Sequence, residues 1–214
     1  MDSKHKLDKN RTFFDLWSST YDFAPFQFWM KRFHRPVLKE INFLKNGTVL
    51  DISCGTGELL KKIYHLDTEH KLKLKGVDIS SKMLEVAGKK LPKSILLELQ
   101  NVVELQEKDN TYNYIISTEA FHHYPNQEKA MREMVRVTKQ RGKVIVVDIN
   151  FFFQPIHWLF QKWEPGCVYI NNKQQMRKLF EHVGLKQIIQ KRSFLFAIMT
   201  TGIKEKPVTL KQMY

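Results

Sequence analysis

The segment that decides the fold is Val49-Leu50-Asp51-Ile52-Ser53-Cys54-Gly55-Thr56-Gly57-Glu58. It starts as a short apolar run, typical of a buried strand, and reaches two glycines separated by one residue. Glycine lets a ligand approach the backbone closely, because it has no side chain. Ligands of open α/β sheets bind at the carboxyl ends of the strands, so this loop is the first candidate binding site.

On both sides of this loop, apolar runs typical of strands alternate with stretches of helical spacing. The strand-like runs lie at 72–78, 95–99, 114–116 and 144–147, and the helical stretches at 59–66, 83–87 and 130–137. Strands that alternate with helices predict a parallel sheet that is covered on both faces. With right-handed crossovers, this is an α/β fold with a doubly wound, Rossmann-like sheet.

The last third of the chain departs from this alternation. A helix is expected at 176–183, followed by two strand candidates at 188–189 and 194–199. The short basic segment Lys191-Arg192 between the two predicts a turn and an antiparallel hairpin. We therefore expect seven strands, mostly parallel, with a C-terminal antiparallel hairpin.

The N-terminal part predicts two helices. An aromatic helix is expected at about 13–22, Pro25 then breaks the chain, and a helix over 26–44 is stopped by Asn46-Gly47. We expect an N-terminal helical cap (1–45) and a ligand-binding core (46–150). An aromatic lid, a helix and the hairpin (151–214) complete the same domain.

The composition is that of a soluble globular protein. Of the 214 residues, 43% are hydrophobic and 27% charged, and no run approaches the length of a membrane-spanning helix. The polar N-terminus lacks the apolar segment of a signal peptide. Two cysteines, Cys54 and Cys167, are too few for a disulfide framework, so we expect a cytoplasmic protein.

The net charge of +13 is concentrated toward the ends of the chain, and residues 151–214 hold ten basic and three acidic side chains. A basic surface favours nucleic acid or an anionic membrane as a partner. No run of Lys and Arg reaches the five residues typical of a nucleic-acid tract. A lysine-rich, solvated surface is the alternative interpretation.

The spacing of one carboxylate indicates the ligand. Asp78 ends the second predicted strand, 21 residues after Gly57, where it can accept hydrogen bonds from both hydroxyls of a ribose. Leu60 occupies the position of a dinucleotide site's third glycine, and Glu58 places a negative charge where a pyrophosphate would dock. A ligand with an adenosine end, a positive centre and no phosphate fits better, and S-adenosylmethionine is such a ligand.

Several motifs resemble those of one enzyme family. They are the segment 49–57, Gly76-Val77-Asp78-Ile79-Ser80, Phe121-His122-His123, the stretches 133–137 and 141–143, and Trp17-Ser18-Ser19-Thr20-Tyr21-Asp22. From about residue 12 to residue 202, the chain resembles the class I S-adenosylmethionine-dependent methyltransferases. It is most similar to the small-molecule branch that includes the ubiquinone/menaquinone-biosynthesis C-methyltransferases.

The resemblance implies a set of cofactor-binding residues and no metal site. From the methionine end through the sulfonium and the ribose to the adenine, they are Tyr21, Asp51, Ser53, Gly55, Gly57, Ser117, Thr118, Asp78, Ile79, Met83, Asn101 and Val102. Two of them depart from the family's pattern, because Ser53 replaces a glycine and Asn101 replaces the aspartate that contacts the adenine amino group. An Asn carbonyl can still accept from that amino group, so we expect weaker but not abolished cofactor binding.

His122 and His123 are the candidate catalytic bases. They follow the fourth predicted strand, at the edge where a methyl acceptor must lie. An imidazole can take a proton near neutral pH. The alternative is that one histidine packs in the core while the other caps the next helix.

The segment 151–163 is dense in aromatic residues and follows the fifth predicted strand. It predicts an apolar lid over a lipophilic small-molecule acceptor, with Trp158 facing that acceptor. Contact with a membrane surface and packing on the core are the alternatives.

These observations favour methyl transfer to a small, apolar acceptor. An RNA methyltransferase would use the basic surface, but Thr118-Glu119-Ala120-Phe121 stands where base-amino methylation needs Asn/Asp-Pro-Pro-Tyr. A non-catalytic binding protein that keeps the methyltransferase fold is the other alternative.

Overall fold

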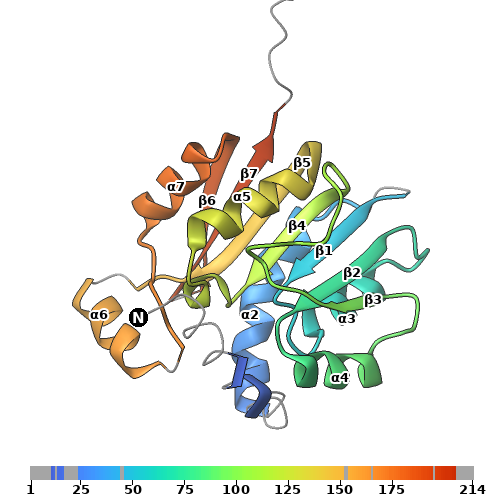
Figure 1. Cartoon of the computed structure of the whole chain (residues 1–214), viewed down its shortest axis with the longest axis horizontal. Coiled ribbons are helices and arrows are strands. Elements are labelled where there is room, and N and C mark those ends of the chain that lie inside the picture. The colour runs from blue at the N-terminus through green and yellow to red at the C-terminus, as the bar shows by residue number, and fades with distance from the viewer. Residues whose placement is uncertain are drawn as a thin grey trace, which may run out of the picture.

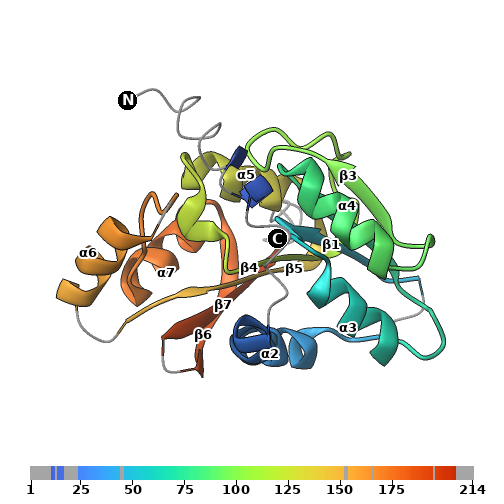
Figure 2. The same cartoon turned by 90° about the horizontal axis from the view of Figure 1, so that it is seen from below.

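The computed structural model describes residues 11–12, 14–16, 24–43, 46–151, 154–164, 166–194 and 196–205. A seven-stranded sheet forms the centre of the molecule, with helices on both of its faces (Figures 1 and 2). The strand order is β3-β2-β1-β4-β5-β7-β6; β1 to β5 are parallel, and β7 is antiparallel to both β5 and β6. The structure confirms the predicted fold class.

The elements alternate along the chain as the apolar pattern predicts. In chain order, they are α2 (Ala24–Glu40), β1 (Thr48–Ile52), α3 (Glu58–Leu66), β2 (Lys73–Asp78), α4 (Ser81–Lys90), β3 (Leu96–Leu99), β4 (Tyr112–Thr118), η1 (Phe121–His123), α5 (Gln127–Val137), β5 (Thr138–Ile149), α6 (Gln154–Trp163), α7 (Lys173–His182), β6 (Leu185–Phe194) and β7 (Ala197–Lys204).

Two hydrophobic layers enclose the sheet. One layer joins α2, α3 and α4 to strand residues such as Val49 and Ile116. The other layer joins α5 and α7 to Leu50 and Ile115, which are adjacent in sequence to Val49 and Ile116. Because successive side chains of a strand point to opposite faces, both members of each neighbouring pair are buried. The helix α2 packs in the same layer as α3 and α4.

The N-terminal helix α2 differs from its predicted course. The helix includes Pro25 in its first turn. Backbone N–H groups there have no partner within the helix, so the missing N–H of proline costs no hydrogen bond, and Pro25 does not interrupt the helix. The helix ends at Glu40, earlier than the predicted 44. Among the described residues, no helix is long and apolar enough to cross a membrane.

The C-terminal hairpin turns later than predicted. Its turn lies between Phe194 and Ala197, whereas Lys191 and Arg192 pair with Met199 and Ile198 inside the ladder. Because β6 is an edge strand of the sheet, charged side chains there can reach solvent without leaving the strand. The basic pair was therefore wrong as a turn signal.

Candidate active site

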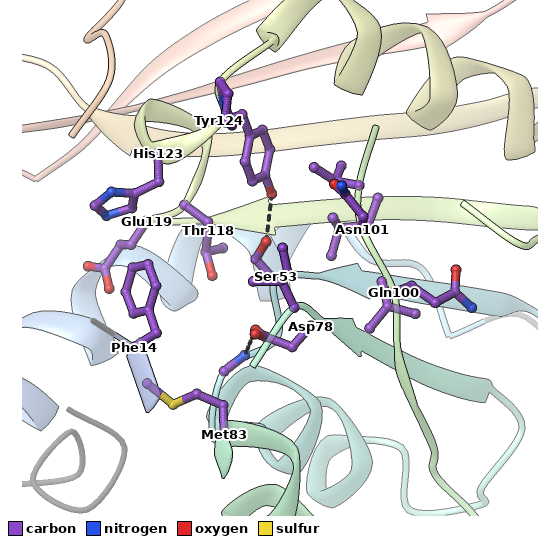
Figure 3. A pocket seen from close by; sticks show the side chains of 17 residues that line it. Phe14, Ser53, Asp78, Met83, Gln100, Asn101, Thr118, Glu119, His123 and Tyr124 are labelled. Atoms are coloured by element: carbon purple, nitrogen blue, oxygen red, sulfur yellow. Dashed lines mark hydrogen bonds between the residues drawn. The ribbon is translucent and has the colours of Figure 1, made fainter. Parts of the chain in front are cut away.

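The loops that follow β1, β2, β3 and β4 meet at the carboxyl edge of the sheet and line a first cavity (Figure 3). Nine residues of the sequence prediction lie on its wall, namely Ser53, Gly55, Asp78, Ile79, Met83, Asn101, Val102, Thr118 and His123. The parallel strands bring these residues together although they are up to 70 positions apart in the chain. Tyr21 lies outside the described residues.

Asp78 connects two of these loops. Its Oδ2 atom accepts a hydrogen bond from the backbone N–H of Gly55 at 2.8 Å, and its Oδ1 atom accepts one from that of Ser80 at 2.9 Å. Burial raises the pKa of this carboxyl, while the backbone donors oppose the shift. A carboxylate oxygen can accept more than one hydrogen bond, so Asp78 retains capacity for ligand hydroxyls.

Asp51 lies deeper, against a small adjoining cavity that also touches Ser53, Gly55 and Thr118. Its Oδ1 atom is buried and accepts no hydrogen bond from the part of the chain that the structure describes. Burial, together with the charge of Asp78, raises the pKa of Asp51 well above its usual range. A cationic ligand group beside Asp51 would relieve this cost, because a buried carboxylate needs a partner.

Two of the predicted cofactor-binding residues that the structure describes, Gly57 and Ser117, line neither of these cavities. A Cβ atom on Gly57 would lie 2.6 Å from the Cδ1 atom of Leu91, and its φ of +79° is unfavourable for other residues. Gly57 therefore allows the loop to turn and to pack on the end of α4. The hydroxyl of Ser117 is buried and hydrogen-bonds the hydroxyl of Tyr124 at 2.9 Å.

Tyr124 was not predicted from the sequence. Its hydroxyl also lies 3.0 Å from the Oγ atom of Ser53, so it links the tip of β4 to the glycine loop (Figure 3). Ser53 has a φ of +57°, and this hydrogen bond helps to hold it where the family has glycine. Tyr124 directly follows the predicted His122-His123 pair.

A second cavity of about 580 Å³ adjoins the first. Its walls are mainly apolar and comprise Phe14, Phe33, Glu119, His122, His123, Ile149, Phe151, Ile156, Leu159, Phe160, Trp163, Glu164 and Phe196. Phe151, Phe160 and Trp163 belong to the predicted aromatic lid, whereas Phe152 and Phe153 lie outside the described residues. Trp158 does not line this cavity, contrary to the prediction, and the Nζ atom of Lys162 lies 3.7 Å from the centre of its ring.

Three residues line both cavities: Phe14, Glu119 and His123. Figure 3 shows their side chains gathered on one side of the first cavity. Ligands in the two cavities would therefore meet beside these side chains.

Most of the sequence matches a known protein family. A family model described as a methyltransferase domain matches residues 43–198. The chain belongs to the methyltransferase domain family. Two of its curated relatives are demethylmenaquinone methyltransferases. The one from Halalkalibacterium halodurans is 24% identical over 90% of this chain and 88% of its own. The one from Staphylococcus aureus strain Newman is 26% identical over 92% and 90%.

Solved structures share the fold of this methyltransferase. A complex of the Haloferax volcanii Trm112 methyltransferase activator with a methyltransferase has a TM-score of 0.75 at 16% identity, covering 90% of this chain and 98% of that one. The phosphoethanolamine N-methyltransferase 2 of Haemonchus contortus, in complex with S-adenosyl-L-methionine, has a TM-score of 0.68 at 17% identity, over 81% and 52%. The protein is therefore a methyltransferase. The buried Oδ1 atom of Asp51, which has no hydrogen-bond partner in the described part of the chain, suits a cationic ligand such as the S-adenosyl-L-methionine bound by the Haemonchus contortus enzyme.

His122 of the methyltransferase is enclosed by carboxylates. Its Nδ1 atom lies 2.5 Å from Asp148, and its Nε2 atom lies 3.3 Å from Glu164. Burial alone would lower the pKa of His122, but the charge of Asp148 and hydrogen bonds with both carboxylates raise it to about 10. His122 is thus protonated near neutral pH and cannot accept a further proton there.

His123 has the opposite property. Burial and the neighbouring charge of His122 lower its pKa to about 3, so its imidazole is neutral and a weak base. Donor atoms of His122, His123 and Glu164 lie within 4.8 Å of one another, which is close enough for a metal ion. Because His122 is already held by a carboxylate at each nitrogen, a proton accounts for this arrangement, and the absence of a metal stays a prediction.

Proposed function

We propose that this methyltransferase transfers a methyl group to a small, apolar acceptor that occupies the second cavity. The observation that carries the proposal is the position of that cavity. It has about 580 Å³ of mainly apolar space and shares Phe14, Glu119 and His123 with the first cavity. A pocket with apolar walls and a few polar groups at one end favours a lipophilic molecule with one polar region.

For the acceptor, we propose the reduced, quinol form of a demethylated isoprenoid quinone. The support is the similarity to demethylmenaquinone methyltransferases over about 90% of the chain, at 24–26% identity. The ring of such an acceptor would lie near Glu119 and His123, and its apolar tail along Leu159 and Trp163.

We propose that the methyl donor is S-adenosylmethionine and that it lies in the first cavity and its small extension. Asp78 would accept hydrogen bonds from the ribose hydroxyls, and Asp51 would face the ammonium group. The remaining predicted contacts on these walls are Ser53, Gly55, Ile79, Met83, Asn101, Val102 and Thr118. A contact between Tyr21, which lies outside the described residues, and the methionine end stays a prediction.

We further propose a cytoplasmic protein whose helix α6 touches an anionic membrane. Three apolar residues of the acceptor cavity wall on α6, Ile156, Leu159 and Trp163, are also exposed to solvent. Trp158 adds an exposed indole beside Lys162. Amphipathic helices with aromatic and basic residues bind bilayer interfaces, and a quinol could then enter the cavity from the bilayer.

The deciding experiment is a methyl-transfer assay with labelled S-adenosylmethionine. A short-chain demethylmenaquinol analogue, kept reduced, is compared with phosphoethanolamine and with bulk transfer RNA. We expect transfer to the quinol alone. Transfer to RNA would support the alternative that uses the basic surface, and cofactor binding without transfer to any acceptor would support a non-catalytic protein.

A further inference from the structure

The boundary between the two cavities is the place where a methyl group must pass from donor to acceptor. Phe14, Glu119 and His123 are the residues that line both spaces. Any group that takes a proton from the attacked part of the acceptor must lie within hydrogen-bond reach of it. Within the described chain, Glu119 and His123 are the titratable side chains at this boundary.

The backbone of Glu119 is held in an unfavourable conformation. It follows the last residue of β4 with a φ of +55°, in the left-handed region that glycine prefers. Its N–H donates to the carbonyl oxygen of Val147 at 2.9 Å, which fixes the residue against β5. Strain of this kind clusters at functional sites, where the side chain is needed at that place. A glycine here would remove the strain but also the carboxyl group.

The side chain of Glu119 is partly buried at the boundary between the two cavities. No hydrogen bond from the part of the chain covered by the structure reaches its oxygens. The charged and titratable groups around it come from four elements: His122 and His123 of η1, Asp148 of β5, Lys62 of α3, and Glu164 directly after α6. Burial raises the pKa of Glu119 to about 7, with Asp148 and Glu164 adding to the rise and His122 and Lys62 opposing it.

Neither histidine is suited to act as the general base. His122 is protonated and fixed by Asp148 and Glu164, whereas His123 has a pKa of about 3. General bases work best when their pKa lies near the working pH. Glu119 meets this requirement, and the two histidines do not.

We propose that Glu119 is the catalytic base of this methyltransferase and takes the proton of an acidic O–H group of the acceptor. The inference rests on the proposed function. The S–CH₃ bond of the donor breaks with its electron pair kept on sulfur, and the electron pair of a ring carbon, made nucleophilic by loss of the O–H proton, forms the new bond to the methyl carbon. The keto intermediate returns to the quinol when this carbon gives its C–H proton to water and the ring oxygen takes a proton from water. The acceptor's O–H proton moves to the Glu119 carboxylate, so a sulfonium and a carboxylate become a thioether and a carboxylic acid. The acid returns its proton to water once the products leave.

The first test compares Glu119→Gln, Glu119→Asp and the matched control Glu85→Gln, which changes an exposed carboxyl on α4. With the demethylmenaquinol analogue, we expect kcat to fall roughly 10²- to 10⁴-fold in Glu119→Gln, the range for loss of a general base. Glu119→Asp should recover part of this loss. Cofactor affinity should change less than about threefold, because binding and proton transfer are separate. The wild-type kcat/KM should rise as pH passes about 7, and Glu119→Gln should lack this rise.

Folding of the variants is controlled with Glu119→Gly, which relieves the positive φ. We expect this variant to be folded and inactive, and to regain activity when formate or acetate is added. A kcat within threefold of wild type in Glu119→Gln, with the pH dependence retained, would overturn the assignment. So would a failure of the small carboxylates to rescue Glu119→Gly.

A second measurement does not depend on the acceptor. Infrared difference spectra of the acceptor-free protein should show a protonated carboxyl band that titrates near pH 7 and is absent from Glu119→Gln. If no such band exists between about pH 5 and 9, Glu119 is not the base, whatever the substrate is. If the band exists but the wild type does not methylate the quinol, the proposed acceptor is wrong, and the titrating carboxyl of Glu119 stands.

Discussion

The Nδ1 atom of His122 lies 2.5 Å from the Oδ1 atom of Asp148, and both side chains are buried. This pair stabilises the protonated imidazole, because a buried positive charge needs a negative partner. The adjacent His123, under the influence of that positive charge, stays neutral. Two neighbouring histidines in the sequence therefore differ in protonation state in the folded protein.

The His122–Asp148 pair predicts how stability depends on pH. Folding raises the pKa of His122 from 6.5 to about 10, so its contribution to stability is fully present below about pH 6.5. The contribution declines above that pH and is lost as the pH rises through about 10. We expect the Tm of the wild type to fall more steeply between these values than that of His122→Gln, whose side chain does not titrate. Equal slopes in calorimetry would show that His122 is not protonated in the folded protein.

Asp78 offers a test of the ribose contact. We expect Asp78→Asn to weaken S-adenosylmethionine binding by roughly 1–3 kcal/mol, because two charge-assisted hydrogen bonds lose their charge. Titration calorimetry measures the change, with the exposed Asp109→Asn as a matched control. If both variants bind equally well, Asp78 does not contact the ligand.

Gly57 separates folding from binding. In Gly57→Ala, the positive φ of +79° becomes unfavourable, and the added Cβ presses on Leu91. The Leu91 side chain can move, so we expect the backbone strain to dominate, at about 1–2 kcal/mol of lost stability. A Cβ atom at position 57 would face α4 and not the cavities. The cofactor affinity of the folded variant should therefore stay within threefold of the wild-type value. A large loss of affinity at unchanged Tm would place Gly57 in the binding site.

The fold and the gathering of most predicted residues around the first cavity could be predicted from the sequence, because they depend on local patterns. The apolar run before Ser53 and the carboxylate Asp78 are fixed by the ends of β1 and β2, and parallel strands bring such ends together. The apolar second cavity was likewise indicated by the density of aromatic residues in 151–163.

The roles of individual side chains were harder to predict from the sequence. Tyr124 acts through hydrogen bonds to Ser53 and Ser117, which depend on packing between distant segments. Glu119 stands one position after Thr118, but its positive φ and its neighbours at the boundary between cavities have no signature in sequence. The spacing of aromatic residues also could not show which face of α6 lines the cavity, so Trp158 was assigned to the wall in error.

The two tryptophans of α6 give a matched pair for the acceptor and membrane proposals. Trp163 lines the acceptor cavity and is 80% exposed, whereas Trp158 is 58% exposed and lies off the cavity. Both replacements by alanine should leave the Tm nearly unchanged, because exposed side chains contribute little to the core. We expect Trp163→Ala to raise the KM for a detergent-solubilised quinol several-fold, and Trp158→Ala to leave it unchanged.

Binding to anionic vesicles tests the proposed membrane contact of α6 separately from its role as a cavity wall. Replacing either tryptophan with alanine reduces the apolar area that can enter the bilayer interface. Both variants should therefore sediment less with phosphatidylglycerol vesicles than the wild type does. Each form should bind less to neutral phosphatidylcholine vesicles, since the charge of Lys162 is attracted to anionic lipid. If Trp158→Ala lowers turnover of the solubilised quinol as much as Trp163→Ala does, the cavity does not hold the acceptor as proposed. If neither variant changes vesicle binding, α6 is a cavity wall and not a membrane contact.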